Sequence, residues 1–182
     1  MTRLILLVTL SLAGCASGPQ KLPALPSDVS APYVLGAGDS LKITVFGETD
    51  LSGVYNVAET GSIAMPLVGN VPALGLTVPE LQRRLTAQLD ARAVKSPDVT
   101  VQIAEYRPFY ILGEVKNPGS YAYVPDMTVL TAVAIAGGFT FRAAEDEVSV
   151  TRRQEGASRE ARARRDARIL PGDVVYVFER HF

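Results

Sequence analysis

The sequence predicts an α+β protein with two small folded units behind an N-terminal leader. Two observations lead to this fold class. Short segments with an apolar residue at every second position recur in both halves of the chain, and this period of two is typical of half-buried strands. Each half also contains one helical segment, the first beginning at Thr77 and the second at Thr128. Strands with one helix among them predict a small mixed sheet with that helix packed against it.

The leader is expected to occupy residues 1–14. Arg3 precedes the apolar run 4–12, which is too short to cross a bilayer of about 30 Å as a helix and is therefore typical of an export signal. The small residues Ala13 and Gly14 then precede Cys15, as in the cleavage site of a bacterial lipoprotein. Cys15 would become the mature N-terminus and accept a diacylglyceryl group. The alternative is an ordinary secretory signal followed by an incidental cysteine.

Composition excludes several classes of protein. Without the leader the chain has 168 residues, of which 17 are basic and 19 are acidic. This balance argues against nucleic-acid binding, which usually needs a clearly basic surface. The single cysteine cannot form a disulfide within the chain. No later apolar run approaches the roughly 20 residues of a membrane helix, so we expect the mature protein to be anchored to a membrane without crossing it.

Residues 15–32 are expected to be the lipidated cysteine and a flexible tether, because 16–32 are rich in Pro, Ser and Ala and show no periodicity. The first folded unit is expected over 33–106. Its first strand follows the Gly38–Asp39 turn, with Leu41, Ile43 and Val45 on the buried face. A second strand is expected over 62–68, where Pro66 indicates a strand edge or a strand end.

The first unit is also expected to contain a helix and a closing strand. Thr77 and Glu80 have the spacing of a capping box, with the Thr77 hydroxyl accepting from the Glu80 amide and the Glu80 carboxylate accepting from the Thr77 amide. Leu81, Leu85 and Leu89 follow on one stripe and predict an amphipathic helix of about four turns that ends before Pro97. Apolar residues at 99, 101 and 103 predict the closing strand.

The second unit is expected over 107–182. Residues 109–115 predict a strand, 116–119 a type II turn with Pro118 and Gly119 at its centre, and 121–123 the hairpin partner. The helix from Thr128 to Ala136 is apolar on nearly every face and is therefore expected to be buried, ending at Gly137–Gly138. The remaining prediction is a strand at Val148 and Val150, an exposed loop over 152–168, and a last strand at Val175 and Val177 after the Gly172–Asp173 turn.

No catalytic, metal or cofactor site is predicted. Asp39 and Asp173 each precede a strand, where an aspartate commonly accepts backbone N–H groups instead of doing acid–base chemistry. The glycines at 36 and 38 are followed by a strand and not directly by a Lys–Ser pair, which excludes a phosphate loop there. The sole histidine, His181, has no cysteine or histidine cluster around it in the sequence. The acids at 145–147 are expected to be a solvated edge, with glycan acid–base catalysis as the alternative.

The arginine-rich stretch 152–168 has two interpretations. Interleaved acids predict a solvated surface of loop and strand. The sharper hypothesis is that Arg162, Arg164 and Arg165 contact an acidic polysaccharide or an acidic face of a neighbouring subunit.

Motifs in order along the chain resemble the outer-membrane polysaccharide export lipoproteins. The segments 33–39, 61–63, 65–69 and 96–99 resemble the polysaccharide export domain of that family. The segments 109–115, 117–119, 136–138 and 170–177 resemble the soluble-ligand-binding β-grasp domain that follows it. The matching positions are Gly38, Asp39, Gly61, Pro66, Gly69, Pro97, Gly113, Pro118, Gly119, Gly137, Gly138, Gly172 and Asp173.

The resemblance implies a transport component. Such proteins form homo-oligomeric rings in the periplasm, dock on an inner-membrane chain-length regulator (a copolymerase), and give capsular or exopolysaccharide a route to the cell surface. Ala16 after the cysteine suggests sorting to the outer membrane, with the protein facing the periplasm. Larger members carry a C-terminal helix that lines a membrane pore, whereas this sequence stops at Phe182. We therefore expect a short member that relies on a separate outer-membrane β-barrel for the exit.

Two alternatives come from other functional classes. The first is a lipid-anchored glycan-binding protein that retains polysaccharide at the cell surface without moving it. The second is a glycan-modifying enzyme, which would need a cleft with perturbed carboxylates.

Overall fold

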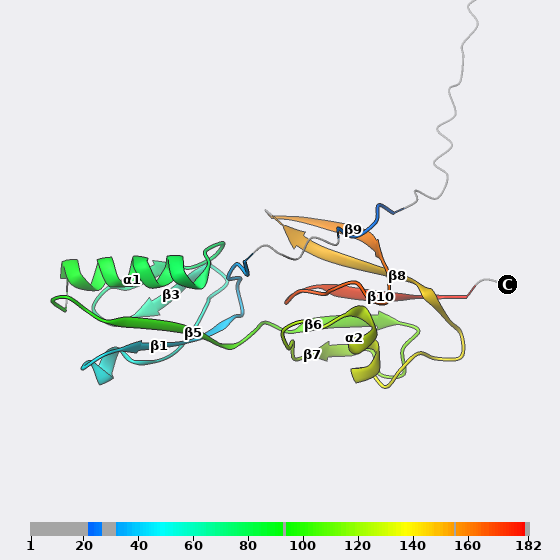
Figure 1. Cartoon of the computed structure of the whole chain (residues 1–182), viewed down its shortest axis with the longest axis horizontal. Helices are drawn as coiled ribbons and strands as arrows, with labels where there is room; N and C mark the ends of the chain where they lie inside the picture. The colour runs from blue at the N-terminus through cyan, green and yellow to red at the C-terminus, as the bar shows by residue number, and fades with distance from the viewer. Residues whose placement is uncertain (1–21, 27–31, 93, 155, 181–182) are drawn as a thin grey trace, which may run out of the picture.

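Two hydrophobic cores, one in each half of the chain, organise the structure (Figure 1). The computed structural model describes residues 22–26, 32–92, 94–154 and 156–180. The predicted leader, the lipidation residue Cys15 and His181 lie outside the described residues. Both halves combine strands with one α-helix, which confirms the α+β class. Among the described residues, no helix has both the length and the apolar character needed to span a membrane.

The first half is built on an antiparallel three-stranded sheet in the order β2–β1–β5, together with a separate hairpin of β3 and β4. Alternation buries Leu41, Ile43 and Val45 of β1, as predicted. The elements are β1 (Ser40–Val45), the 3-10 helix η1 (Thr49–Leu51), β2 (Gly53–Asn56), β3 (Ser62–Met65), β4 (Gly69–Pro72), α1 (Val78–Arg92) and β5 (Val99–Glu105).

Helix α1 lies along β5 and closes this core (Figure 1). Leu81, Leu85 and Leu89 are buried, which confirms the predicted stripe. The Thr77 N–H donates to the Glu80 carboxylate at 2.8 Å, as the capping box predicts. The Thr77 hydroxyl also donates to that carboxylate oxygen at 2.8 Å, where the prediction had it accepting from the Glu80 amide.

The segment around Pro66 differs from its prediction. The strand expected over 62–68 ends at Met65, so Pro66 follows a strand end, and the chain turns back through Val68 to form β4. Neither β2 nor β4 was predicted. β4 buries only Val71 and β2 has no buried residue, so neither strand produces the alternating apolar pattern on which the prediction depends.

The second half contains a five-stranded sheet in the order β7–β6–β10–β8–β9, with α2 packed against one face (Figure 1). Only the pair β10–β6 is parallel. Phe109 and Ile111 of β6 face the same core as Val175 and Val177 of β10. The elements are β6 (Phe109–Gly113), β7 (Gly119–Tyr121), α2 (Val129–Ile135), β8 (Ala143–Gln154), β9 (Ala157–Ala163) and β10 (Val174–Glu179).

The connection from β6 to β7 is not the predicted type II turn. That turn needs a positive φ at Gly119, but Gly119 does not have one and is already part of β7. The connection instead rests on the end of α2, where the backbone N–H and side-chain amide of Asn117 both donate to the Ala136 carbonyl. The hairpin consequently pairs Ile111 with Gly119, two residues earlier than expected.

Helix α2 begins and ends as predicted but is not buried all round. Thr128 is the N-cap, and its side chain accepts from the Thr131 N–H. At the other end Gly137 has φ +86°, a backbone conformation that favours glycine. Leu130 and Ile135 are each 49% exposed, because a helix on one face of an open sheet buries only one side.

The arginine-rich stretch 152–168 is largely a hairpin, and the predicted exposed loop is wrong there. Strand β8 runs through Gln154 and pairs with β9 in a continuous antiparallel register from Val148–Ala163 to Gln154–Ala157. Ala161 and Ala163 point into the core while the arginines between and after them are exposed. Because alanine is only weakly hydrophobic, the alternation of buried alanines with charged residues in β9 was not recognised as a strand pattern.

The predicted flexible tether is also wrong for the part that the structure describes. Ala24 forms a parallel bridge with Arg162 on the outer edge of β9. The Arg162 N–H donates to the Pro23 carbonyl and the Leu25 N–H donates to the Arg162 carbonyl, both at 2.7 Å. The Leu25 side chain packs against the second core. Residues 22–26 are thus held against the outer edge of β9 by one parallel bridge.

Candidate functional site

Asp39 closes the turn that leads into β1, and its carboxylate is fully buried. It accepts the backbone N–H of Gly36 at 2.8 Å and that of Arg107 at 3.0 Å. The Arg107 guanidinium donates to the same carboxylate at 3.1 Å, and the Tyr33 hydroxyl donates at 2.6 Å. A buried carboxylate needs such partners, because an unpaired charge would be costly to take out of water. The predicted structural role of Asp39 agrees with these contacts.

Asp173 is the equivalent buried carboxylate at the turn into β10. Its carboxylate is 1% exposed and accepts the backbone N–H of Leu170 at 2.7 Å. Arg152 of β8 donates to it from both Nε and Nη2, at 3.0 and 2.7 Å, in the forked geometry that only arginine offers. Asp173 therefore ties β8 to the start of β10.

Arg107 stands at the junction of the two halves, between β5 and β6. Its guanidinium contacts Asp39 and Tyr33 of the first half, at 3.1 and 2.8 Å. A Cβ at Gly36 or at Gly172 would collide with the guanidinium, so a glycine from each half makes room for it. Motif residues from both halves, including Gly38, Asp39 and Gly172, are thus brought together around Arg107.

A chain of tyrosines crosses the same junction. Tyr33 and Tyr106 meet edge to face with ring centroids 5.1 Å apart, and Tyr106 and Tyr123 do so at 5.4 Å. Burial and the hydrogen bond to Asp39 raise the pKa of Tyr33, so its hydroxyl stays protonated and keeps donating. Burial also raises the pKa of Tyr123. The junction is a packed, hydrogen-bonded contact that sets how the two halves lie relative to each other.

Sequence reasoning missed Arg107 and Arg152. Each arginine is distant in sequence from the aspartate it binds, and no local pattern connects the two. The available signal was indirect: Gly38–Asp39 and Gly172–Asp173 are the same turn-to-strand motif, so each should bury a carboxylate that needs a cation.

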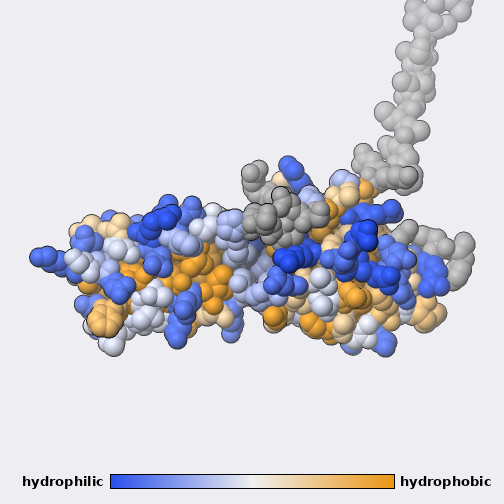
Figure 2. Space-filling view, viewed as in Figure 1, coloured by the Kyte–Doolittle hydropathy of each residue, from blue (hydrophilic) through white to orange (hydrophobic). Residues whose placement is uncertain are grey.

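The predicted contact arginines lie on or beside β9. Arg162 is within the strand, whereas Arg164 and Arg165 follow it, and all three are exposed. Arg164 pairs with Asp166 at 3.2 Å, and Arg165 pairs with Glu145 and Asp146 at 3.8 and 3.4 Å. The acids that were weighed for catalysis are therefore on the surface, as the solvated-edge interpretation expects. Figure 2 shows strongly hydrophilic side chains gathered over the region of β8, β9 and β10.

The remaining motif residues lie at separate turns and strand ends. Gly61 precedes β3, Pro66 follows it and Gly69 starts β4, Pro97 precedes β5, Gly113 ends β6, Pro118 precedes β7 and Gly119 starts it, and Gly137 and Gly138 follow α2. They shape the backbone at these turns and do not converge on one cavity.

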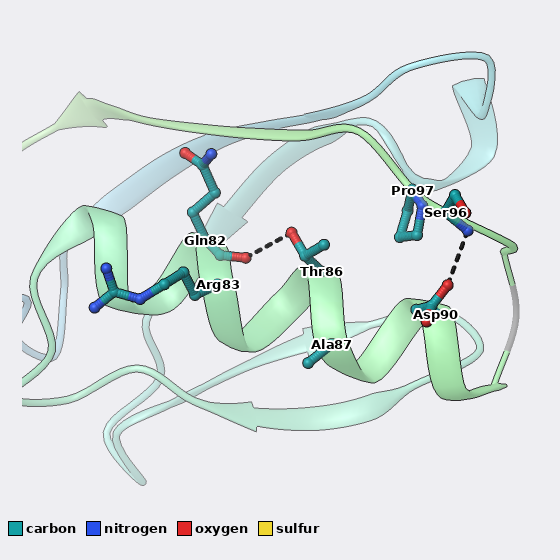
Figure 3. A pocket seen from close by; sticks show the side chains of 7 residues that line it. All are labelled: Gln82, Arg83, Thr86, Ala87, Asp90, Ser96 and Pro97. Carbon is teal, nitrogen blue, oxygen red and sulfur yellow. Dashed lines mark hydrogen bonds between the residues drawn. The ribbon is translucent and has the colours of Figure 1, made fainter.

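An open hollow lies beside α1 and is lined by polar and small residues (Figure 3). Asp90 accepts the Ser96 N–H at 2.8 Å, and the Thr86 hydroxyl donates to the Gln82 carbonyl at 3.0 Å. The first bond ties the last turn of the helix to the segment that follows it, and the second lies within the helix, so these groups are satisfied by backbone neighbours. In the part of the chain that the structure describes, no group of three or more His, Cys, Asp or Glu side chains is placed to hold a metal.

Comparison with known proteins assigns both halves. Residues 27–104 match the family described as polysaccharide biosynthesis/export protein, and residues 108–162 match the SLBB domain. The chain is 33% identical over 149 residues to the exopolysaccharide production protein ExoF of Rhizobium meliloti (strain 1021), covering 75% of this chain and 33% of ExoF.

Two other relatives have related names. The EPS I polysaccharide export outer membrane protein EpsA of Ralstonia solanacearum is 31% identical over 151 residues, covering 68% of this chain and 40% of EpsA. The polysialic acid transport protein KpsD of Escherichia coli is 29% identical over 108 residues, covering 58% of this chain and 19% of KpsD. The chain spans less than half the length of each of these relatives.

Proposed function

Because this chain belongs to the polysaccharide biosynthesis/export family and carries an SLBB domain, we propose that it is a component of a capsular or exopolysaccharide export machine. The observation that carries this proposal is the match of both domain types, in order, over most of the chain. Relatives named for exopolysaccharide production, EPS I export and polysialic acid transport support the same class of function. The family consists of export and transport proteins and not of enzymes.

In this proposal the protein is anchored in the outer membrane by a lipid on Cys15 and faces the periplasm. It forms a homo-oligomer that serves as a conduit for polysaccharide. Its proposed partners are the polysaccharide, an inner-membrane chain-length regulator and an outer-membrane β-barrel that supplies the exit. Moving a polymer needs many weak, reversible contacts and no bond making. The fixed junction around Arg107 supports this role, because subunits of a ring must repeat one geometry.

The test is the amount of external polysaccharide in a deletion strain. The strain is complemented with the intact chain, with Cys15→Ala, or with Ser17→Ala as a matched control in the same segment. Export by an anchored component predicts that external polymer disappears on deletion and returns with the intact chain and S17A but not with C15A.

Shedding of normal amounts of polymer from the cell would contradict export and favour the alternative, retention of glycan at the surface. Full restoration by C15A would contradict the lipid anchor. Detergent extracts of the intact strain should contain the protein as an oligomer, and recovery of monomer alone would contradict the conduit.

A further inference from the structure

The charge of the chain is unevenly distributed. Residues 152–168 contain seven arginines and three acids, a net charge of +4. The rest of the chain from Cys15 onward contains ten basic and sixteen acidic residues, a net charge of −6. The β8–β9 hairpin and the residues after it are therefore rich in arginine on an otherwise acidic protein, and Arg152, Arg165 and Arg168 pair with acids from outside this stretch. An excess of basic side chains is the electrostatic character of a surface that binds an anionic partner.

The N-terminal segment that the structure describes, residues 22–26, lies against the same hairpin. Residues 22–26 lie along the outer edge of β9, held by two 2.7 Å hydrogen bonds between Arg162 and the backbone of Pro23 and Leu25. Paired in this way, the edge of β9 is covered at Arg162. Leu22, the first residue that the structure describes, therefore belongs to a segment that lies beside β9.

A lipid at Cys15 would keep this edge close to a membrane. Leu22 is seven positions after Cys15, and a fully extended chain covers at most about 3.6 Å per residue. The anchor then lies within about 25 Å of the β9 edge. Had residues 22–26 been a free tether, the first half of the protein could have approached the membrane equally well. This step rests on the lipid anchor proposed above.

Three arginines are presented at this edge. Arg159, Arg162 and Arg164 are exposed on β9 or directly after it. Of these, Arg164 also pairs with Asp166 at 3.2 Å, while Arg152 is held by the buried Asp173. A guanidinium matches a phosphate group in charge and in forked geometry, and each basic side chain near an anionic bilayer adds to its attraction for the surface.

We infer that the β9 edge is a membrane-contacting surface whose arginines bind the phosphate groups of anionic phospholipids. The anchored strand favours this partner over an acidic polysaccharide, because tethering holds the arginines at a high effective concentration of headgroups. A lipid chain combined with a basic patch is also a general route to stable placement on a bilayer. In this arrangement the second half lies against the membrane and the first half points away.

The first test uses vesicle co-sedimentation. The chain from residue 15 onward, with Cys15→Ser to prevent acylation, is mixed with vesicles of phosphatidylcholine alone or of equal parts phosphatidylcholine and phosphatidylglycerol. Binding is expected only to the anionic vesicles, and R159Q/R162Q/R164Q should weaken it at least about tenfold. The matched control K42Q/R83Q/K95Q removes three exposed cations from the first half and should leave binding unchanged. R159K/R162K/R164K should retain binding, which separates charge from folding.

Two results would overturn the inference. One is equal binding by the triple glutamine variant and the control. The other is a triple glutamine variant that no longer binds soluble polygalacturonate but still binds anionic vesicles, which would assign the surface to an acidic glycan instead.

The second test uses the lipidated full chain. A fluorophore on Ser158→Cys at the start of β9 should transfer energy to a headgroup acceptor, whereas one on Ser52→Cys in the first half should not. Equal transfer from both sites would refute the orientation. Neither test requires polysaccharide or an export partner, so its failure leaves the export proposal standing. Unchanged external polymer in the deletion strain, together with normal vesicle binding, would count against the export proposal alone.

Discussion

Asp39 and Asp173 occupy equivalent places in the two halves of the molecule. Each carboxylate accepts the backbone N–H of the residue three positions earlier, at 2.8 Å for Asp39 and 2.7 Å for Asp173. Each is buried, and each binds an arginine that comes from a distant part of the chain. The same local motif thus starts β1 in one half and β10 in the other, with a long-range ion pair fixing each turn.

Asp39→Ala is expected to lower the free energy of unfolding by about 3 kcal/mol, because it leaves the guanidinium of Arg107 and two backbone N–H groups without their acceptor. The 25% exposure of Arg107 keeps the cost at the lower end of the range for buried pairs. Urea denaturation measures this directly. Asp50→Ala, at an exposed aspartate of η1, should change stability by less than about 0.5 kcal/mol. Similar losses for both variants would contradict the role assigned to the Asp39 turn.

Arg152→Lys tests the forked contact to Asp173. Lysine keeps the charge but cannot donate from two positions of a rigid plane, so we expect a loss of about 1–2 kcal/mol in unfolding free energy. The neighbouring Arg153→Lys is the matched control, because Arg153 is exposed and should tolerate the change. Thermal melting of the two variants side by side provides the comparison. A stable R152K would show that charge alone satisfies Asp173.

These two ion pairs mark the limit of what the sequence predicts. Local patterns gave β1, the cap and stripe of α1, and the turn role of both aspartates. They could not give Arg107 or Arg152, since the partner of a buried charge is decided by how distant segments pack. Family motifs gave the domain types, but the gathering of Gly38, Asp39 and Gly172 around one arginine follows only from the fold.

The hairpin of β8 and β9 was not predicted, for a different reason. Its inward side chains include Ala161 and Ala163, which are too small to register as a hydrophobic face, while the arginines suggested solvent. The pairing of residues 22–26 was not predicted either. A segment that pairs with an existing sheet edge is held by hydrogen bonds to the partner's backbone, so it needs no side-chain periodicity of its own.

Gly113→Ala is expected to prevent folding or to cost more than about 4 kcal/mol. Gly113 has φ +84°, and a Cβ there would run into the backbone carbonyl of Val177 in β10, which cannot move without breaking the sheet. Gly47→Ala separates the steric collision from the conformational cost of the positive φ. Gly47 has φ +78° with open space around its Cβ position, so it should show only the conformational cost of about 1 kcal/mol. Soluble yield and chemical denaturation check both variants, and equal effects would contradict the steric argument.

Glu80 gives a prediction about pH. The hydrogen bond from the Thr77 backbone N–H, followed by that from its hydroxyl, lowers the pKa of Glu80 below its usual value. Because the folded pKa is lowered, the stabilising cap is fully present above the usual glutamate pKa and is lost as the pH falls through the lowered pKa. An NMR titration of the Glu80 carboxyl should show this. Thr77→Ala should raise the pKa only part of the way, since the backbone donor remains. A complete return to the usual value would assign the shift to the hydroxyl.

Leu25→Ser should release residues 22–26 from the edge of β9. Leu25 packs against the second core, and its loss removes the apolar contact that supports the two hydrogen bonds to Arg162. The Arg162 N–H, which donates to Pro23, should then exchange with solvent at least about tenfold faster. The Ala163 N–H is an internal control, because successive amides of a strand point to opposite edges and this one faces β8. Leu25→Met conserves the volume and should leave both amides protected. Unchanged exchange at Arg162 in the serine variant would mean that the backbone pairing holds the segment by itself, and Leu25 would then have no part in placing the β9 edge.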